Sequence, residues 1–173
     1  MELDIIPLLL ALLPALLVGV IAFYFFNLHT KNEEHRRRFL LQKESQKQAL
    51  PLRLQAYERL ALFLERIAPG NLLIRVVPTS NDKEDYEMLL SKMIEQEYEH
   101  NLTQQIYISD ACWNIIRTAK NTTISLIRKT KSNPEVLDAD EFRKTILTEL
   151  IDKNSPSDTA LEFLKKEVAE IFQ

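Results

Sequence analysis

The chain has 173 residues, of which 46% are hydrophobic and 27% are charged, and its formal net charge is −3. This balance excludes a disordered chain and suits one modest globular domain with an additional apolar segment. Only two glycines occur, Gly19 and Gly70. Strand-rich folds and phosphate-binding loops need glycine for tight turns and close backbone approach. The composition therefore predicts a mainly α protein and argues against most nucleotide-binding loops.

The first predicted element is a membrane-spanning helix from Ile5 to Phe26, a segment without a charged residue. At ~1.5 Å per residue it is roughly 33 Å long, enough to cross a hydrocarbon core of ~30 Å. It contains Pro14 and Gly19 and ends in an aromatic cluster of the kind found at membrane interfaces. A cleaved signal peptide is the alternative. The acidic start, the long apolar run and the bulky aromatic exit argue against it.

Basic residues are absent before this segment and frequent after it, beginning with Lys31 and the cluster Arg36, Arg37 and Arg38. Positively charged flanks stay on the cytoplasmic side, so we predict that the N-terminus lies outside and the rest inside. A single cysteine, Cys112, permits no internal disulfide and agrees with a reducing compartment. The arginine cluster is either ordinary positive-inside charge or a contact with anionic lipid headgroups.

Three regions follow from these patterns: an anchor over 1–28, a basic helical stalk over 29–50 and a compact all-helical cytoplasmic domain over 51–173. Pro51 is expected to end the stalk, because the residue before a proline is disfavoured in a helix. The next helix has an apolar stripe at three- and four-residue spacing and stops at Pro69 and Gly70. This stripe consists of Tyr57, Leu60, Ala61, Leu64 and Ile67.

Residues 71–78 are rich in Leu, Ile and Val. We expect a short extended segment packed on the helices, and the alternative is a strand edge that pairs with a partner chain. Further helices are predicted after the capping residues Asn81, Ser109, Asp138 and Ser155. Pro156 at the first helical position and Asp158 at the third make the last of these starts the clearest. The predicted core stripes of these helices comprise Tyr86, Leu89, Leu90, Met93, Ile94, Tyr98, Cys112, Ile115, Ile116, Ala119, Leu126, Ile127, Phe142, Ile146, Leu150, Ile151, Leu161, Leu164, Val168 and Ile171.

No catalytic, cofactor-binding or metal site is predicted. Glu97 and His100 stand three apart, which is half of a bundle-type carboxylate site, but the second Glu-x-x-His that such a site needs is missing. Cys112 follows a helix start, which favours a thiolate, yet it lies on an apolar stripe, which favours a buried structural cysteine. No serine-hydrolase, zinc-protease or P-loop motif occurs in the sequence.

The most distinctive non-core feature is a basic face on the predicted helix after Ser109. Its residues Arg117, Lys120, Arg128 and Lys131 fall within a sector of roughly 80°. Such a face binds an acidic partner or anionic lipid, or it is simply a solvated surface near a helix C-terminus. Residues 51–173 carry 16 basic and 20 acidic side chains, so nucleic-acid binding is not expected.

Two stretches resemble an uncharacterised family of short bacterial membrane-anchored proteins. They are FNLHTKNEEHRRRFLLQKESQKQALPLRLQAYERLALFLERIAPGNLLIRV (26–76) and EQEYEHNLTQQIYISDACWNIIRTAKNTTISLIRK (95–129). The resemblance implies bacterial origin, hence the inner membrane, and the layout of an anchor followed by a helical domain. It implies no activity and no functional residue.

The leading functional hypothesis is a non-enzymatic interaction or scaffold protein that positions a protein partner, or a second copy of itself, at the cytoplasmic membrane face. One alternative is a peripheral sensor of anionic lipid that uses the basic clusters. Another is a membrane-associated enzyme without a recognisable motif.

Overall fold

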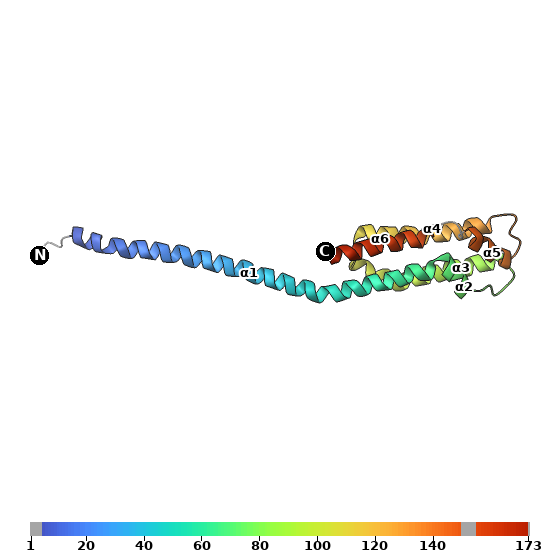
Figure 1. The fold of residues 1–173 in the computed structure, drawn as a ribbon, viewed down its shortest axis with the longest axis horizontal. Coiled ribbons are helices and arrows are strands. Elements are labelled where there is room, and N and C mark those ends of the chain that lie inside the picture. The colour runs from blue at the N-terminus through green and yellow to red at the C-terminus, as the bar shows by residue number, and fades with distance from the viewer. Residues whose placement is uncertain (1–4, 150–154, 173) are drawn as a thin grey trace. The chain divides into compact units, whose positions relative to one another are not determined.

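The computed structural model describes residues 5–149 and 155–172, and every regular element in these ranges is a helix. Figure 1 shows them in chain order. The elements are α1 (Ile5–Ile67), α2 (Pro69–Arg75), α3 (Lys83–Asn101), the short 3₁₀ helix η1 (Leu102–Ile106), α4 (Asp110–Lys131), α5 (Ala139–Glu149) and α6 (Pro156–Ile171). The predicted mainly α fold is thus confirmed over the described residues.

By packing, the chain divides between Ala49 and Leu50 into two units. The first unit consists of the N-terminal part of α1, whose side chains are exposed from Leu13 onward wherever they are described. From Leu13, α1 is long and apolar enough to cross a membrane, judged by length and composition. None of its most apolar window is buried against other parts of the protein.

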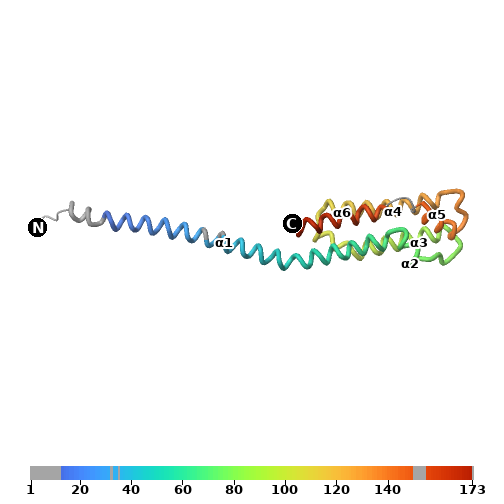
Figure 2. The backbone as a smooth tube through the Cα atoms, in the orientation of Figure 1, coloured from blue at the N-terminus to red at the C-terminus, as the bar shows by residue number. Residues whose placement is uncertain are grey.

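The second unit is a helical bundle, which the backbone trace in Figure 2 shows clearly. The C-terminal part of α1, α3, α4 and α6 run alternately in opposite directions, and α5 lies at one end (Figures 1 and 2). The connections that contain α2, η1 and α5 reverse the direction of the chain each time, so that the long helices bury their apolar stripes against one another.

The bundle core is built largely from the predicted stripes, although Phe63, Trp113 and Ile124 also belong to it and the predicted Leu126 does not. Tyr57, Leu60, Leu64 and Ile67 of α1 are buried, and Ala61 is half-buried. In the later helices the fully buried residues include Tyr86, Leu90, Ile94, Ile116, Ile127, Phe142 and Ile146. Leu150 and Ile151, which were also expected in the core, lie outside the described residues.

Aromatic rings connect the core helices. Tyr86 of α3 meets Phe142 of α5 edge to face, with ring centroids 5.8 Å apart. The Tyr98 ring stacks on the Trp113 ring with centroids 5.4 Å apart, and its centroid lies 6.0 Å from that of Phe63. Tyr98 of α3 therefore packs against both α4 and α1. The phenol of Tyr86 is buried and donates to the carbonyl of Val76 at 2.6 Å, so its polar atom is satisfied.

Of the two predicted helix ends in this region, one is wrong and one is confirmed. Pro51 does not end the stalk helix, because α1 continues through it to Ile67. Pro51 is exposed, and solvent can hydrate the Lys47 carbonyl that its missing N–H leaves without an intrahelical partner. Pro69 and Gly70 do follow the end of α1, but they also begin α2, where proline is suited to the first position.

The expected extended segment over 71–78 is also wrong, because α2 reaches Arg75. The buried residues Pro69, Leu72, Leu73 and Val76 recur at helical spacing, whereas a strand would bury alternate residues. Ile74 and Val77 are exposed, at 71% and 54% of their surface. The composition of residues 71–78 is typical of a strand, but the spacing of the buried residues in this segment is helical.

Most predicted caps are confirmed. The Ser109 hydroxyl accepts a hydrogen bond from the Cys112 amide, and Asp138 accepts one from Glu141. Ser155 and Asp158 form a complete capping box at the start of α6. The cap of α3 is Asp82, one residue after the expected Asn81, and its carboxylate accepts from the Glu84 amide at 2.7 Å.

Candidate functional site

Three places in the bundle gather polar or exposed apolar side chains: two carboxylate networks and one open groove. The first network centres on Glu167 of α6. Its carboxylate accepts hydrogen bonds from the Tyr57 phenol at 2.6 Å, the Ser109 hydroxyl at 2.6 Å and the Ser109 amide at 3.0 Å. Arg53 supports the network by donating to the Tyr57 phenol at 3.3 Å and to the Tyr107 carbonyl at 3.1 Å.

The acid–base properties of this network argue for a structural role. Burial acts to raise the pKa of Glu167, but the hydrogen bonds from Ser109, Tyr57 and Cys112 hold the pKa below its usual range. Burial and the neighbouring Glu167 raise the pKa of the Cys112 thiol to about 12 and that of the Tyr57 phenol to about 12. A thiol with that pKa is not a nucleophile at neutral pH, because the thiolate is the reactive form. We therefore interpret the Glu167 network as a clamp between α1, α4 and α6.

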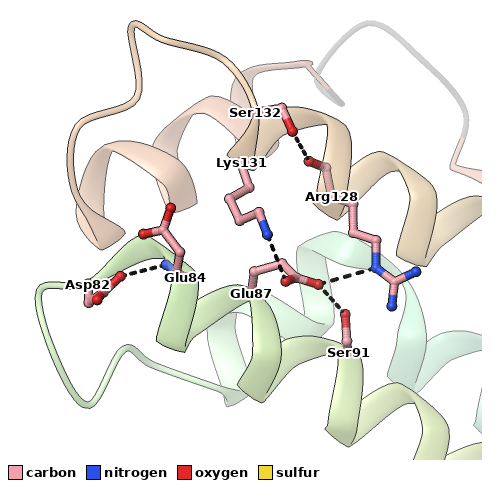
Figure 3. A network of polar contacts seen from close by, with 7 residues as sticks. All are labelled: Asp82, Glu84, Glu87, Ser91, Arg128, Lys131 and Ser132. Carbon is pink, nitrogen blue, oxygen red and sulfur yellow. Dashed lines mark hydrogen bonds and ion pairs between the residues drawn. The ribbon is translucent and has the colours of Figure 1, made fainter.

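The second network, shown in Figure 3, joins α3 to α4 through Glu87. Glu87 accepts from Ser91 at 2.8 Å, Lys131 at 3.2 Å and Arg128 at 3.4 Å. Burial acts to raise the pKa of Glu87, but these donors lower it overall. Its side chain is only 12% exposed, so the cations pack against a largely desolvated carboxylate.

The structure divides the predicted basic face among different partners. Lys120 is buried, donates to both carboxylate oxygens of Glu95 at 2.8 Å and lies 4.6 Å from the centroid of the Tyr98 ring. Arg128 and Lys131 bind Glu87, as described above. Arg117 is exposed and donates to Asn114 at 3.0 Å. Three of the four cations are thus engaged with α3, whereas Arg117 forms no ion pair with a described residue.

The remaining residues singled out in the sequence lie in α1 or α3. Ile5, Pro14, Gly19 and Phe26 belong to α1, and Phe26 is 72% exposed. The cluster Arg36, Arg37 and Arg38 is exposed on α1, and Arg36 lies 3.7 Å from Glu33.

Glu97, considered above as half of a metal site, instead forms ion pairs with Arg66 at 2.6 Å and Arg75 at 3.3 Å. His100 is exposed. Among the described residues, no group of three or more potential metal ligands is found.

The third feature is a groove of about 540 Å³ between α4 and α6. Its floor is apolar and is formed by Ile115 and Ala119 of α4 with Ala160 and Phe163 of α6. The walls carry hydroxyl groups rather than charges on the α4 side, from Thr118 and Thr122. This surface is suited to contact with another protein helix, because small residues let two backbones approach closely.

On the α6 side the groove is also lined by Pro156, Thr159, Glu162 and Lys166. This groove was not predicted from the sequence. The available signal was Phe163, an aromatic residue that falls outside the core stripe of Leu161, Leu164, Val168 and Ile171. Phe163 is half-buried against the core and also lines the groove. No pattern in α6 alone indicates that α4 would supply the other wall.

The fold and these sites define a mainly helical protein in which one long N-terminal helix is apolar enough to cross a membrane and the remainder forms a bundle. Within that class, the chain belongs to a family of unknown function, DUF7935, which matches residues 3–171. The resemblance to an uncharacterised family is thereby confirmed. No curated protein matches the sequence, and no solved structure matches it.

Proposed function

We propose that this protein is a single-pass, membrane-anchored scaffold that positions a protein partner at the cytoplasmic face of a bacterial inner membrane and has no enzymatic activity. The observation that carries the proposal is the two-part character of α1. Residues Leu13 to Phe26 expose large apolar side chains, whereas Ala56 to Ile67 of the same helix supply core residues of the bundle. An exposed apolar surface of this length is unfavourable in water and favourable in lipid.

Two further features support a scaffold. The half-buried carboxylates Glu87 and Glu167 each bind several donors within the bundle, which uses them for packing rather than for chemistry. The single thiol of the chain, Cys112, is buried and has a raised pKa. Meanwhile the groove between α4 and α6 is open and largely uncharged, as a protein-contact surface is.

The anchor is tested with two matched pairs of substitutions in the full-length chain, expressed in a bacterial host. Leu16→Asp with Val20→Asp places two charges in the proposed span, and each costs roughly 2.5–3.5 kcal/mol at the centre of a membrane helix. Leu40→Asp with Leu41→Asp makes the same chemical change in the stalk. After alkaline carbonate extraction we expect wild type and the stalk variant in the membrane pellet and the span variant largely in the supernatant. Release of the wild-type protein by carbonate would contradict the anchor.

Orientation and partner binding are measured on the same material. Protease added to intact spheroplasts should leave a C-terminal tag uncut, and lysis should expose it. Purification from native membranes in mild detergent, followed by mass spectrometry, should then give a stoichiometric protein. A tag cleaved in intact spheroplasts would reverse the orientation, and recovery of the chain as an isolated monomer would remove the scaffold role.

A second candidate function, binding of anionic lipid, is favoured by the exposure of Arg36, Arg37 and Arg38 next to the apolar part of α1. It predicts that the chain without residues 1–26 binds vesicles containing phosphatidylglycerol and not purely zwitterionic vesicles. Binding should weaken as salt rises, because exposed charges are screened. Replacing the three arginines by glutamine should remove it, whereas equal binding to both kinds of vesicle would eliminate this candidate.

A further inference from the structure

The rim of the groove between α4 and α6 carries two opposite charges, Glu162 and Lys166, one helical turn apart on α6. Both side chains are exposed, and neither takes part in an ion pair with another described residue. Phe163 lies beside them on the apolar floor. The facing wall on α4 is uncharged, being formed by Thr118 and Thr122.

This arrangement is self-complementary. When two α6 helices pack antiparallel across a two-fold axis, the order of charges in one helix is reversed relative to the other. Glu162 of each copy then faces Lys166 of the other, so the contact contains two equivalent ion pairs. Because residues 162 and 166 are placed symmetrically about the centre of the contact, Phe163 of each copy lies within one residue of that centre and close to the axis.

We infer that the groove between α4 and α6 is a homodimer contact and that its occupant is α6 of a second copy of this chain. The inference rests on the proposed function in one respect: it identifies a protein partner of the membrane-anchored module. The charges of Glu162 and Lys166 cancel, and they lie beside an apolar floor. This surface therefore suits a second copy of the chain better than a strongly acidic or strongly basic partner. Tethering in one membrane would favour the contact further, since it raises the effective concentration of the chains.

Charge reversal tests this pairing on the full-length protein in mild detergent. Glu162→Lys places a lysine opposite Lys166 of the other copy in both pairs, and Lys166→Glu places two glutamates opposite each other. Exposed ion pairs contribute modestly to an interface, and a repulsion between like charges opposes it to a similar extent. Converting two attractions into two repulsions should therefore weaken the homodimer roughly tenfold or more. Analytical ultracentrifugation over a range of protein concentrations measures the dissociation constant.

Two combinations distinguish the proposed register from a general effect of charge. The double variant Glu162→Lys with Lys166→Glu exchanges the members of each pair and should restore the wild-type dissociation constant. The two single variants, carrying different affinity tags and mixed, should co-purify as a heterodimer, because each lysine again meets a glutamate. A partner of different sequence would produce neither result.

Lys165→Glu is the matched control, since Lys165 is exposed on α6 but does not line the groove. It makes the same charge change as Lys166→Glu and should leave the dissociation constant within about twofold of wild type. Circular dichroism of each variant checks that its helical content equals that of wild type.

The proposal is overturned if the wild-type chain is monomeric, or if it dimerises equally with Glu162→Lys and Lys166→Glu, which would place the contact elsewhere. These outcomes leave the proposed function distinguishable. A different protein that co-purifies with wild type and is lost with Glu162→Lys would support the scaffold and exclude the second copy. If carbonate releases the wild-type chain from membranes and the chain still dimerises, the anchor is excluded and the dimer contact is retained.

Discussion

At the scale of single residues, Glu167 shows how one carboxylate holds three helices together. Its partners Tyr57 and Ser109 come from α1 and from the start of α4, and they donate at 2.6 Å each. Such charge-assisted hydrogen bonds are stronger than neutral ones, and a partner left alone in a partly buried place loses its hydration without compensation. The clamp therefore stabilises the bundle only while Glu167 is ionised.

The first prediction concerns the pH dependence of this clamp. Because the pKa of Glu167 lies below its ordinary value of 4.5 in the folded protein, the unfolded chain takes up the proton first as the pH falls. Its contribution to the free energy of unfolding is complete above about pH 5 and is lost as the pH drops through the folded pKa.

Urea unfolding of the chain without residues 1–26, at pH 7 and at pH 3.5, tests this expectation. Glu167→Gln should lower stability by about 2 kcal/mol at pH 7 and by less at pH 3.5. Glu87, whose pKa is also lowered, should leave a residual pH dependence in the variant. An equal loss of stability at both pH values would contradict the role of the ionised carboxylate.

The second prediction uses two buried threonines of α4. The Thr123 hydroxyl is fully buried and has no hydrogen-bond partner among the described residues, whereas the Thr130 hydroxyl donates to the Leu126 carbonyl at 3.1 Å. Replacing threonine by valine preserves shape and removes the hydroxyl. Thr123→Val should raise the free energy of unfolding by about 1 kcal/mol, because an unsatisfied polar group is removed from the core. Thr130→Val, the control, should be neutral or destabilising, and an equal gain in both would refute the distinction.

At the scale of secondary-structure elements, α2 is the most informative segment. Seven residues form an isolated helix only marginally, since helix nucleation is costly. Burial of Leu72, Leu73 and Val76 in the core therefore decides its conformation. The segment is rich in residues that favour strands, so local composition and tertiary packing disagree here, and packing prevails.

The third prediction tests the helical state of α2 at Gly70. A Cβ atom added at Gly70 meets nothing within 4 Å, and its backbone φ is not positive. Gly70→Ala should stabilise the protein by about 0.5–1 kcal/mol, because alanine is the better helix former. Gly70→Val should gain less, since β-branched residues are less favourable in helices. If valine stabilises more than alanine in thermal unfolding, the segment is extended rather than helical.

At the scale of the whole molecule, the two units differ in what they bury. The buried hydrophobic residues of the bundle core lie between Ala56 and Leu164, within the second unit. The first unit has no buried side chain among those described, and its large apolar residues are exposed. Folding of the bundle should therefore not depend on the apolar N-terminal segment.

The fourth prediction follows from this separation. A chain of residues 50–173 should be soluble and should unfold in one cooperative thermal transition, followed by circular dichroism. A chain of residues 61–173 should lose that transition, since it lacks the buried Ala56, Tyr57 and Leu60 and also Arg53, which supports the Glu167 clamp. Equal melting of the two chains would show that this part of α1 is not needed for the core.

Helix positions and core residues followed largely from sequence, because apolar spacing and capping residues are local signals. Ser155, Pro156 and Asp158 identified the start of α6, and Ser109 that of α4. The groove could not be derived in this way, since its floor combines Ile115 with Phe163, about fifty positions apart. The Glu167 clamp was missed for the same reason: a glutamate on an amphipathic helix has no local mark that distinguishes a clamp from a solvated side chain.

The sequence by itself determined the helical class, the apolar N-terminal helix and most of the bundle core, since each depends on composition or on a period within one segment. Only the tertiary structure decided that α1 passes through Pro51, that residues 69–75 are helical and that Lys120, Arg128 and Lys131 are engaged by acidic residues of α3. These outcomes depend on which surfaces meet and which are left to solvent, and that is a property of packing between segments distant in the chain.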